Sequence, residues 1–326
     1  YLITLRKAGL MKILFCAICC FTISIGSQHD EIPNSNQLLG VKEKIVTNYN
    51  YEEKFGSYVV SSKNETIYKY DLESNEVEIE KYLDNIIWYQ EIKYFDDSNN
   101  LAKTIGYYLL SGDSSKTEFH YNEYNKLIEQ IQYEFDGSIK TIEKLQYDIS
   151  DNLIEESTFN KSGEYIDNVF GYSKVIRKYN DDNNIIEISY YSPRGELTIE
   201  RISNSSRKIF SYDADKRLIR SKSIYLFDIT ESEAIYEYSI NDKITIINNL
   251  NSKGNLNSID KYTYDQKGNN TIIKTFDALE TLSFRVQKLY DVSNRLIETN
   301  IISIKIKFGE EVEIPISKET IEYIGY

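Results

Sequence analysis

One short pattern recurs along most of the chain: an aromatic residue, a turn-forming residue directly after it, and an apolar residue five positions further on. Its nine copies begin at Tyr70, Phe95, Tyr121, Tyr147, Tyr179, Tyr212, Tyr238, Tyr264 and Tyr290. Successive copies lie 25, 26, 26, 32, 33, 26, 26 and 26 residues apart. A fixed period in this range predicts a repeat architecture in which each copy is one supersecondary unit.

The residues of each copy specify a tight turn. The residue after the aromatic is Asp, Asn or Ser, whose side chain bonds to the backbone two residues on. Three positions later, seven of the nine copies have Gly, Asn or Asp, the residues that tolerate positive φ. This combination predicts a type I turn followed by a left-handed residue, which is the loop of a bulged β-hairpin. In seven copies the next strand then begins with Leu or Ile.

A second, looser turn falls between copies, for example at Asp136-Gly137 and at residues 251–254. Each unit therefore holds two strands, and the fold class is all-β, a continuous antiparallel meander of about 16–18 strands from about nine hairpin repeats. A flat sheet of this width is unstable, so we expect a twisted, spiral or solenoid-like sheet, or a partly closed barrel, with an edge strand at each end. Residues 45–326 are predicted to form this single repeat domain, after a polar lead-in at 27–44.

The N-terminal segment has the features of an export signal. Met11-Lys12 precedes an uncharged apolar run over 13–25, and Gly26 is a small residue suited to cleavage. This pattern predicts a signal peptide at 11–26, with a buried N-terminal strand as the alternative, and residues 1–10 read as upstream read-through. The mature chain would then be exported, that is, secreted, periplasmic or at the cell surface.

All three cysteines lie inside that segment, at Cys16, Cys19 and Cys20. They come too early in the apolar run for a lipoprotein signal, so lipid anchoring is the less favoured alternative. The chain after residue 26 has no thiol and can form neither a disulfide nor a thiolate metal site.

The charge balance limits the partners. The chain has 38 basic and 51 acidic residues, and removing residues 1–26, with three basic residues and no acid, leaves 35 − 51 = −16. Phosphate backbones and anionic headgroups repel such a chain, so we expect no nucleic-acid partner. We also expect no transmembrane segment in the mature chain. The expected partner is a protein or a carbohydrate, without a cofactor.

The copies at 212–218, 264–268 and 290–296 resemble the YD-repeat, or rearrangement-hotspot (Rhs), family, whose unit reads approximately Tyr-Asp-x-x-Gly-Arg-Leu. The resemblance covers about residues 65–300. It implies an exported or surface protein, here a short stand-alone member. Large members wind into a hollow β-shell that can hold a toxin domain, and the repeats are linked to carbohydrate binding. Two departures stand out: Asn mostly replaces the turn Gly, and residues 148–213 carry six or seven extra residues per unit. Hairpin repeats of MORN type are a looser alternative.

No catalytic or metal site emerges from the sequence. His29 and His120 lack a companion nucleophile, and the Asp pairs at 96–97 and 181–182 lack a full calcium-loop spacing.

The candidate binding residues are two adjacent aromatic pairs, Trp88-Tyr89 and Tyr190-Tyr191. Neighbours on a strand point to opposite faces, and exposed rings stack on sugars or partners. Cross-strand packing is the competing role for these rings. The function predicted is a non-enzymatic β-surface for a protein or glycan, with a carboxylate-based hydrolase such as a glycosidase as the alternative. The extra residues in 148–213 are the first place to look for a site.

Overall fold

The computed structural model describes residues 38–307 and 309–326, so the predicted read-through and signal peptide lie outside the described residues. The described chain is one antiparallel sheet of 20 strands. The strands are β1 (Val41–Lys54), β2 (Ser57–Tyr70), β3 (Glu76–Leu83), β4 (Ile86–Phe95), β5 (Leu101–Tyr108), β6 (Asp113–Tyr121), β7 (Leu127–Tyr133), β8 (Ile139–Tyr147), β9 (Leu153–Phe159), β10 (Lys174–Tyr179), β11 (Ile185–Tyr191), β12 (Arg207–Tyr212), β13 (Leu218–Ile224), β14 (Thr230–Tyr238), β15 (Ile244–Asn251), β16 (Leu256–Tyr264), β17 (Asn270–Asp277), β18 (Leu282–Tyr290), β19 (Leu296–Lys307) and β20 (Glu310–Gly325). A 3₁₀ turn, η2 (Leu226–Asp228), lies between β13 and β14. In this part of the chain, no helix is long and apolar enough to cross a membrane.

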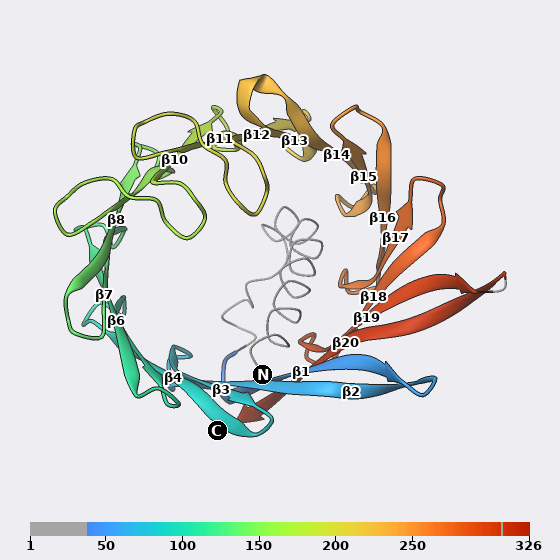
Figure 1. The fold of residues 1–326 in the computed structure, drawn as a ribbon, viewed down its shortest axis with the longest axis horizontal. Helices are drawn as coiled ribbons and strands as arrows, with labels where there is room; N and C mark the ends of the chain where they lie inside the picture. Colours follow the sequence, from blue (N-terminus) through green and yellow to red (C-terminus); the bar gives the residue numbers. More distant parts are fainter. Residues whose placement is uncertain (1–37, 308) are drawn as a thin grey trace.

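The sheet closes on itself. Each strand pairs with its neighbours in the chain, and β1 also pairs with β20, from Val41 opposite Gly325 to Asn50 opposite Ser317. Figure 1 shows the resulting ring of strands. The all-β meander is confirmed, but the expected spiral or solenoid with two free edges is wrong, and β1 begins inside the expected lead-in. Closure gives hydrogen-bond partners to the backbone groups of both edge strands, which would otherwise be unpaired.

The nine predicted Tyr-Asp turns lie on one rim of the ring, here called the Tyr-Asp rim, where they connect β2 to β3, β4 to β5 and so on to β18 and β19. The looser turns, such as those at 134–137 and 251–254, lie on the opposite rim. Asp148 is typical, since its Oδ1 accepts from the backbone N–H of Ser150 at 2.8 Å and of Asn152 at 2.9 Å. The predicted left-handed residue has positive φ in every copy, including the two with unfavourable residue types: Ser74, Asn99, Asn125, Asp151, Asn183, Lys216, Asp242, Gly268 and Asn294. A register shift beside each turn marks the predicted bulge, and bulges add twist and bend to a sheet.

The aromatic position has a second role that the sequence did not show. The Tyr147 hydroxyl donates to the backbone carbonyl of Leu127, which begins the neighbouring strand, at 2.9 Å. The same bond recurs at 2.8–3.1 Å from Tyr121, Tyr179, Tyr212, Tyr238, Tyr290 and Tyr323. The ring of hydroxyl-to-carbonyl bonds explains why tyrosine rather than phenylalanine is the usual residue here.

A second ladder links the turns to one another. The side-chain amide of Asn152 donates to Asp148 of its own turn at 3.0 Å and to Asn183 of the next turn at 2.9 Å. Residues at the same repeat position make the same pair of contacts in other copies: Asn75, Asn100, Arg217 and Asn269. These side-chain bonds between copies set the spacing of neighbouring hairpins along the rim.

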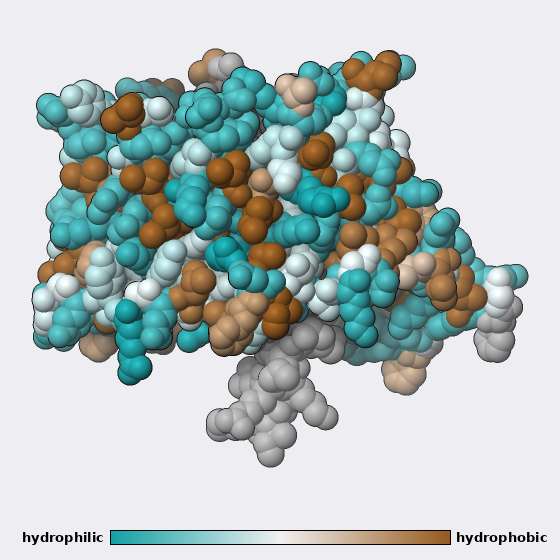
Figure 2. Space-filling view, turned by 90° about the horizontal axis from the view of Figure 1, so that it is seen from above, coloured by the Kyte–Doolittle hydropathy of each residue, from teal (hydrophilic) through white to brown (hydrophobic). Residues whose placement is uncertain are grey.

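The pairing register divides the strand residues into two faces all the way round the ring. One face carries Glu143, Asp260, Glu319 and Lys208, whose pKa values are shifted chiefly by burial. The other face carries exposed ion pairs such as Lys318–Glu298 at 2.6 Å. Side chains converge on the concave side of a curved sheet, so the first face is the inner wall and the second the outer wall. Figure 2 shows a mostly hydrophilic outer wall crossed by rows of hydrophobic groups.

Candidate functional site

The extra residues of the two long repeats build a pair of loops that have no counterpart elsewhere in the ring. The β9–β10 connection makes a first turn at 160–163, a bridge between Phe159 and Tyr165, and then a second turn at 168–171. The β11–β12 connection repeats this plan, with a turn at 192–195 and a later bridge between Glu200 and Ser205. The segments 166–172 and 198–205, here called the inner lobes, bend toward the centre of the ring (Figure 1).

The inner lobes hold each other in place. The backbone N–H of Arg201 donates to the carbonyl of Phe170 at 2.9 Å, and its Nη1 donates to the carbonyl of Val169 at 3.2 Å. Arg201 packs so closely on Gly171, which has φ +87°, that a Cβ there would lie 2.8 Å from its Nε. A side chain at residue 171 would therefore push the lobes apart.

The second lobe is built around a buried carboxylate. Glu200 accepts from the backbone N–H of Ile202 at 2.7 Å, and from the N–H and the hydroxyl of Ser203 at 2.8 and 2.6 Å. Ser205 and Ser206 are buried beside it. Glu200 thus has a structural role, and these bonds make the lobe an ordered part of the wall.

Beneath the lobes, the inner wall carries a group of charged and aromatic side chains, here called the inner-wall cluster: Glu143, Glu156, Tyr172, Arg177, Tyr190 and Lys208. The register places Glu156, Val175 and Tyr190 in one row across β9, β10 and β11. Arg177, Ile188 and Lys208 form the next row across β10, β11 and β12. Since adjacent strands lie about 4.8 Å apart, the Arg177 and Lys208 backbones are about 10 Å apart.

The ionisation of this cluster is perturbed. Arg177 Nη2 binds Glu156 Oε1 at 2.9 Å. Burial, reinforced by the charge of Glu156 and opposed by Arg177, raises the pKa of the Glu143 carboxyl. Burial lowers the pKa of the Lys208 ammonium, against the opposing effect of Glu200. Within the described ranges, neither the Glu143 carboxyl nor the Lys208 ammonium has a hydrogen-bond or ion-pair partner.

Two tyrosines complete the cluster. The rings of Tyr172, in the first inner lobe, and Tyr190, on β11, lie 5.0 Å apart at 41°. Burial raises the pKa of both hydroxyls, and for Tyr190 the charge of Glu200 adds to it. Tyr190 is buried, whereas Tyr172 keeps part of its surface open. An aromatic ring backed by a second ring and flanked by polar groups is a suitable surface for a sugar.

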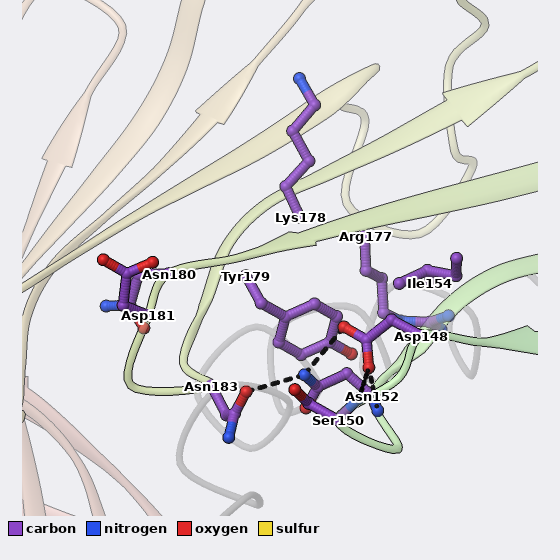
Figure 3. Close-up of a pocket in the computed structure, with 10 residues that line it drawn as sticks. All are labelled: Asp148, Ser150, Asn152, Ile154, Arg177, Lys178, Tyr179, Asn180, Asp181 and Asn183. Atoms are coloured by element: carbon purple, nitrogen blue, oxygen red, sulfur yellow. Dashed lines mark hydrogen bonds between the residues drawn. The ribbon is translucent and has the colours of Figure 1, made fainter.

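Arg177 also lines a cavity of about 390 Å³ that opens at the Tyr-Asp rim, between the turns at 148–152 and 180–183 (Figure 3). The bond between Asn152 and Asn183 crosses this cavity, and Lys178 points away from it. Arg177 Nη1 is buried and has no hydrogen-bond partner among the described residues. The lining is otherwise largely polar, with amide and carboxylate groups of the two turns.

The rim ladder is broken at the next step. Asn184 occupies the bridging position, yet its Nδ2 is buried without a partner among the residues that the structure describes. Its own turn begins with Asn180, whose single side-chain oxygen already accepts two backbone N–H groups, and the next left-handed residue is Lys216, which has no acceptor. The ladder is therefore interrupted within the long repeats, which differ from the other copies in their lobes.

The four predicted binding residues fall in two separate places. Tyr190 lies in the inner-wall cluster, and its neighbour Tyr191 lies on the outer wall under Lys174, whose Nζ is 5.6 Å from the ring centroid. Trp88 and Tyr89 lie on β4, separated from β11 by six strands. Tyr89 donates to Glu91 at 2.7 Å and packs on Tyr108, so cross-strand packing accounts for it. Nothing in the structure tests whether these four residues bind a ligand.

The sequence located the region but not its chemistry. Arg177 and Lys208 lie inside the long repeats that the spacing marked, while Glu143 lies just before them. No local signal marked Glu143, because its inward orientation depends on the register of the whole ring.

His120 lies on the outer wall, where its Nδ1 is 3.1 Å from Glu129 Oε2. In residues 38–307 and 309–326, no group of three or more His, Cys, Asp or Glu is arranged to hold a metal ion.

Comparisons with known proteins give no family. No protein-family model matches the chain, and no curated protein matches it. Among solved structures, a porin-like protein from Bacteroides uniformis aligns over 88% of this chain and 97% of its own, at 8% identity and a TM-score of 0.37. The Photorhabdus luminescens Tc holotoxin pore aligns over 83% of this chain and 19% of its own, at 10% identity and a TM-score of 0.28. A porin-like protein from Bacteroides vulgatus aligns over 87% and 98%, at 8% identity and 0.26. At such scores these likenesses carry no argument about fold or function.

Proposed function

We propose that the chain is an exported member of the YD-repeat type whose closed ring binds a glycan on its inner wall, at the inner-wall cluster. The proposal rests on the structure that the extra residues of the two long repeats adopt. They are not needed to close the ring, because the 26-residue copies make the same turns without them. Instead, they fold into two bonded lobes above the cluster.

The chemistry of the inner wall favours a glycan over a folded protein. Around the ring this wall presents neutral hydrogen-bonding side chains, among them Asn48, Asn64, Thr117, Gln130, Gln132, Thr141 and Asn249. Amides and hydroxyls between aromatic rings match the alternating hydroxyl and apolar faces of a sugar. A folded protein would need a broad, contiguous and complementary surface, which a concave polar wall does not offer.

The outer wall suits water. Its mid-strand ion pairs include Lys69–Glu80 at 2.9 Å and Lys178–Glu187 at 3.1 Å. Lysine and glutamate in the middle of strands are unfavourable against hydrocarbon. This supports an exported protein that works in an aqueous compartment with its ligand inside the ring.

The proposal is tested by screening the purified protein on a glycan array and measuring each hit by isothermal titration calorimetry. Tyr172→Ala removes the open ring of the cluster and should weaken binding at least tenfold. Tyr165→Ala, whose ring lies beside Lys174 on the outer wall, is the matched control and should leave the affinity unchanged. Absence of any glycan hit refutes the proposed function. Binding that survives Tyr172→Ala but is lost in Trp88→Ala refutes the location and moves the site to β4.

A further inference from the structure

We propose that Glu143 and Glu156 form an acid–base pair that hydrolyses a glycosidic bond of the glycan held at the inner-wall cluster. This inference rests on the proposed function, because the bound glycan is the substrate. It adds a catalytic activity to what would otherwise be a binding protein.

The two carboxyls are neighbours on the inner wall. Glu156 on β9 lies opposite Leu145 on β8, and Glu143 lies two residues before Leu145 on the same face. Diagonal neighbours on adjacent antiparallel strands have Cα atoms about 7–8 Å apart. Two flexible side chains at that spacing can flank one glycosidic bond, as glycoside hydrolysis requires. Arg177, which binds Glu156, also lines the cavity at the rim.

The surroundings of the two carboxyls differ in the way an acid–base pair needs. Glu156 has a cationic partner, because Arg177 Nη2 lies 2.9 Å from its Oε1. Glu143 has no hydrogen-bond or ion-pair partner among the described residues and lies beside the negative charge of Glu156, which favours its protonated form. Two carboxyls in such different surroundings can divide the roles of acid and base.

A purely structural role does not account for Glu143. Asp260 is the contrasting case on the same wall, because its two oxygens accept from Asn249 at 2.9 Å and from Thr275 at 2.6 Å. Asp260 therefore stabilises its surroundings through hydrogen bonds. Glu143, which is half-buried, makes none within the described ranges, so no side-chain hydrogen bond gives it a structural role. A carboxyl in such surroundings is a candidate for acid–base chemistry.

The reaction needs only water. The Glu143 carboxyl gives its proton to the glycosidic oxygen while the bond from that oxygen to C1 breaks. A water oxygen bonds to C1, and the Glu156 carboxylate takes the proton that this water loses. Exchange with solvent then moves one proton off Glu156 and one onto Glu143. The products are a sugar with a new reducing end and a sugar with a free hydroxyl. Arg177 is a positioning residue, whose Nη2 orients Glu156.

The test uses the glycans that bind on the array, together with laminarin, xylan, galactan, polygalacturonate and chitin oligomers. New reducing ends are measured for the full chain and for Glu143→Gln, Glu156→Gln and the outer-wall control Glu187→Gln. The wild type should release reducing ends, and each of the first two variants should reduce the rate at least 100-fold, the lower range for loss of a general acid or base. Glu187→Gln should keep the full rate.

Binding and folding measurements separate the outcomes. Both cluster variants should bind the glycan within about threefold of the wild type, because Gln keeps the size of Glu and one of its two acceptor oxygens, and circular dichroism should show the same fold. A glycan that binds but is not cleaved by the wild type overturns the hydrolysis and leaves the proposed function standing. An undiminished rate in Glu143→Gln overturns the assignment of the acid. Absence of both binding and cleavage overturns both proposals.

Discussion

The contribution of the rim ladder to stability can be measured at one residue, Asn269. Its side-chain amide donates to Asp265 at 2.9 Å and to Asn294 of the next copy at 2.6 Å, and the residue is buried. Asn269→Ala removes both bonds. Each hydrogen bond contributes about 1 kcal/mol net, and the acceptor side chains lie on a rim where water can replace the lost donor. We therefore expect the free energy of unfolding to fall by about 2 kcal/mol.

The chain supplies a matched control at the same repeat position. Asn184 has the same side chain at the equivalent place, but its Nδ2 is buried without a partner among the described residues. Asn184→Ala removes no side-chain bond and relieves an unsatisfied donor, so the free energy of unfolding should stay the same or rise slightly. The difference between the two variants isolates the ladder from the general effect of replacing Asn by Ala.

The measurement is urea unfolding followed by circular dichroism, with the free energy obtained by linear extrapolation. Comparison of midpoints is valid where the slope of free energy against urea is the same for both variants and the wild type. Equal destabilisation by Asn269→Ala and Asn184→Ala would refute the claim that bonds between copies stabilise the rim. Unchanged stability of both variants would refute it as well.

Three further outcomes are expected. Tyr147→Phe removes one bond of the tyrosine ladder and should lower the free energy of unfolding by about 1 kcal/mol in the same assay, whereas Tyr124→Phe, on an exposed ring of the same rim, should have no effect. Burial raises the pKa of Tyr236 to about 12, whereas unfolded tyrosines ionise near pH 10, so the folded state holds more protons between these two pH values. The free energy of unfolding should therefore be constant below about pH 10 and fall as the pH rises above it. A flat profile from pH 9 to 12 would contradict this. In a variant with Asn48→Cys and Glu319→Cys, oxidation should cross-link the two ends of the sheet within one molecule and stabilise it by up to about 5 kcal/mol, and failure to cross-link would contradict ring closure.

The sequence predicted only part of the candidate site. The irregular spacing of two copies pointed to residues 148–213, where Arg177, Tyr190 and Lys208 meet. Trp88 and Tyr89 were equally conspicuous in the sequence, yet they lie on β4, far round the ring from the cluster. An aromatic pair looks the same in sequence whether it packs across strands or faces a ligand, so composition cannot separate the two.

The sequence by itself determined the local structure of this protein. The turn at Asp148 needs only an acceptor side chain, a left-handed residue three positions later and an apolar residue after that, and all three lie within six residues. Such contacts act over a few bonds, so residue types suffice to predict them. The same holds for the antiparallel order of the strands, whereas the predicted count of about 16–18 strands fell short of the 20 that the structure has.

The tertiary structure alone decided that the sheet closes, which face is inner and what that face brings together. Closure depends on bend accumulated over 20 strands, and it joins Asn48 to Glu319 across almost the whole described chain. A one-residue change of register in any hairpin would turn Glu143 outward. The β8–β9 hairpin by itself makes Glu143 and Glu156 neighbours, but only closure of the ring makes their face the inner wall, and Tyr190 and Lys208 join that face through the pairing of later strands.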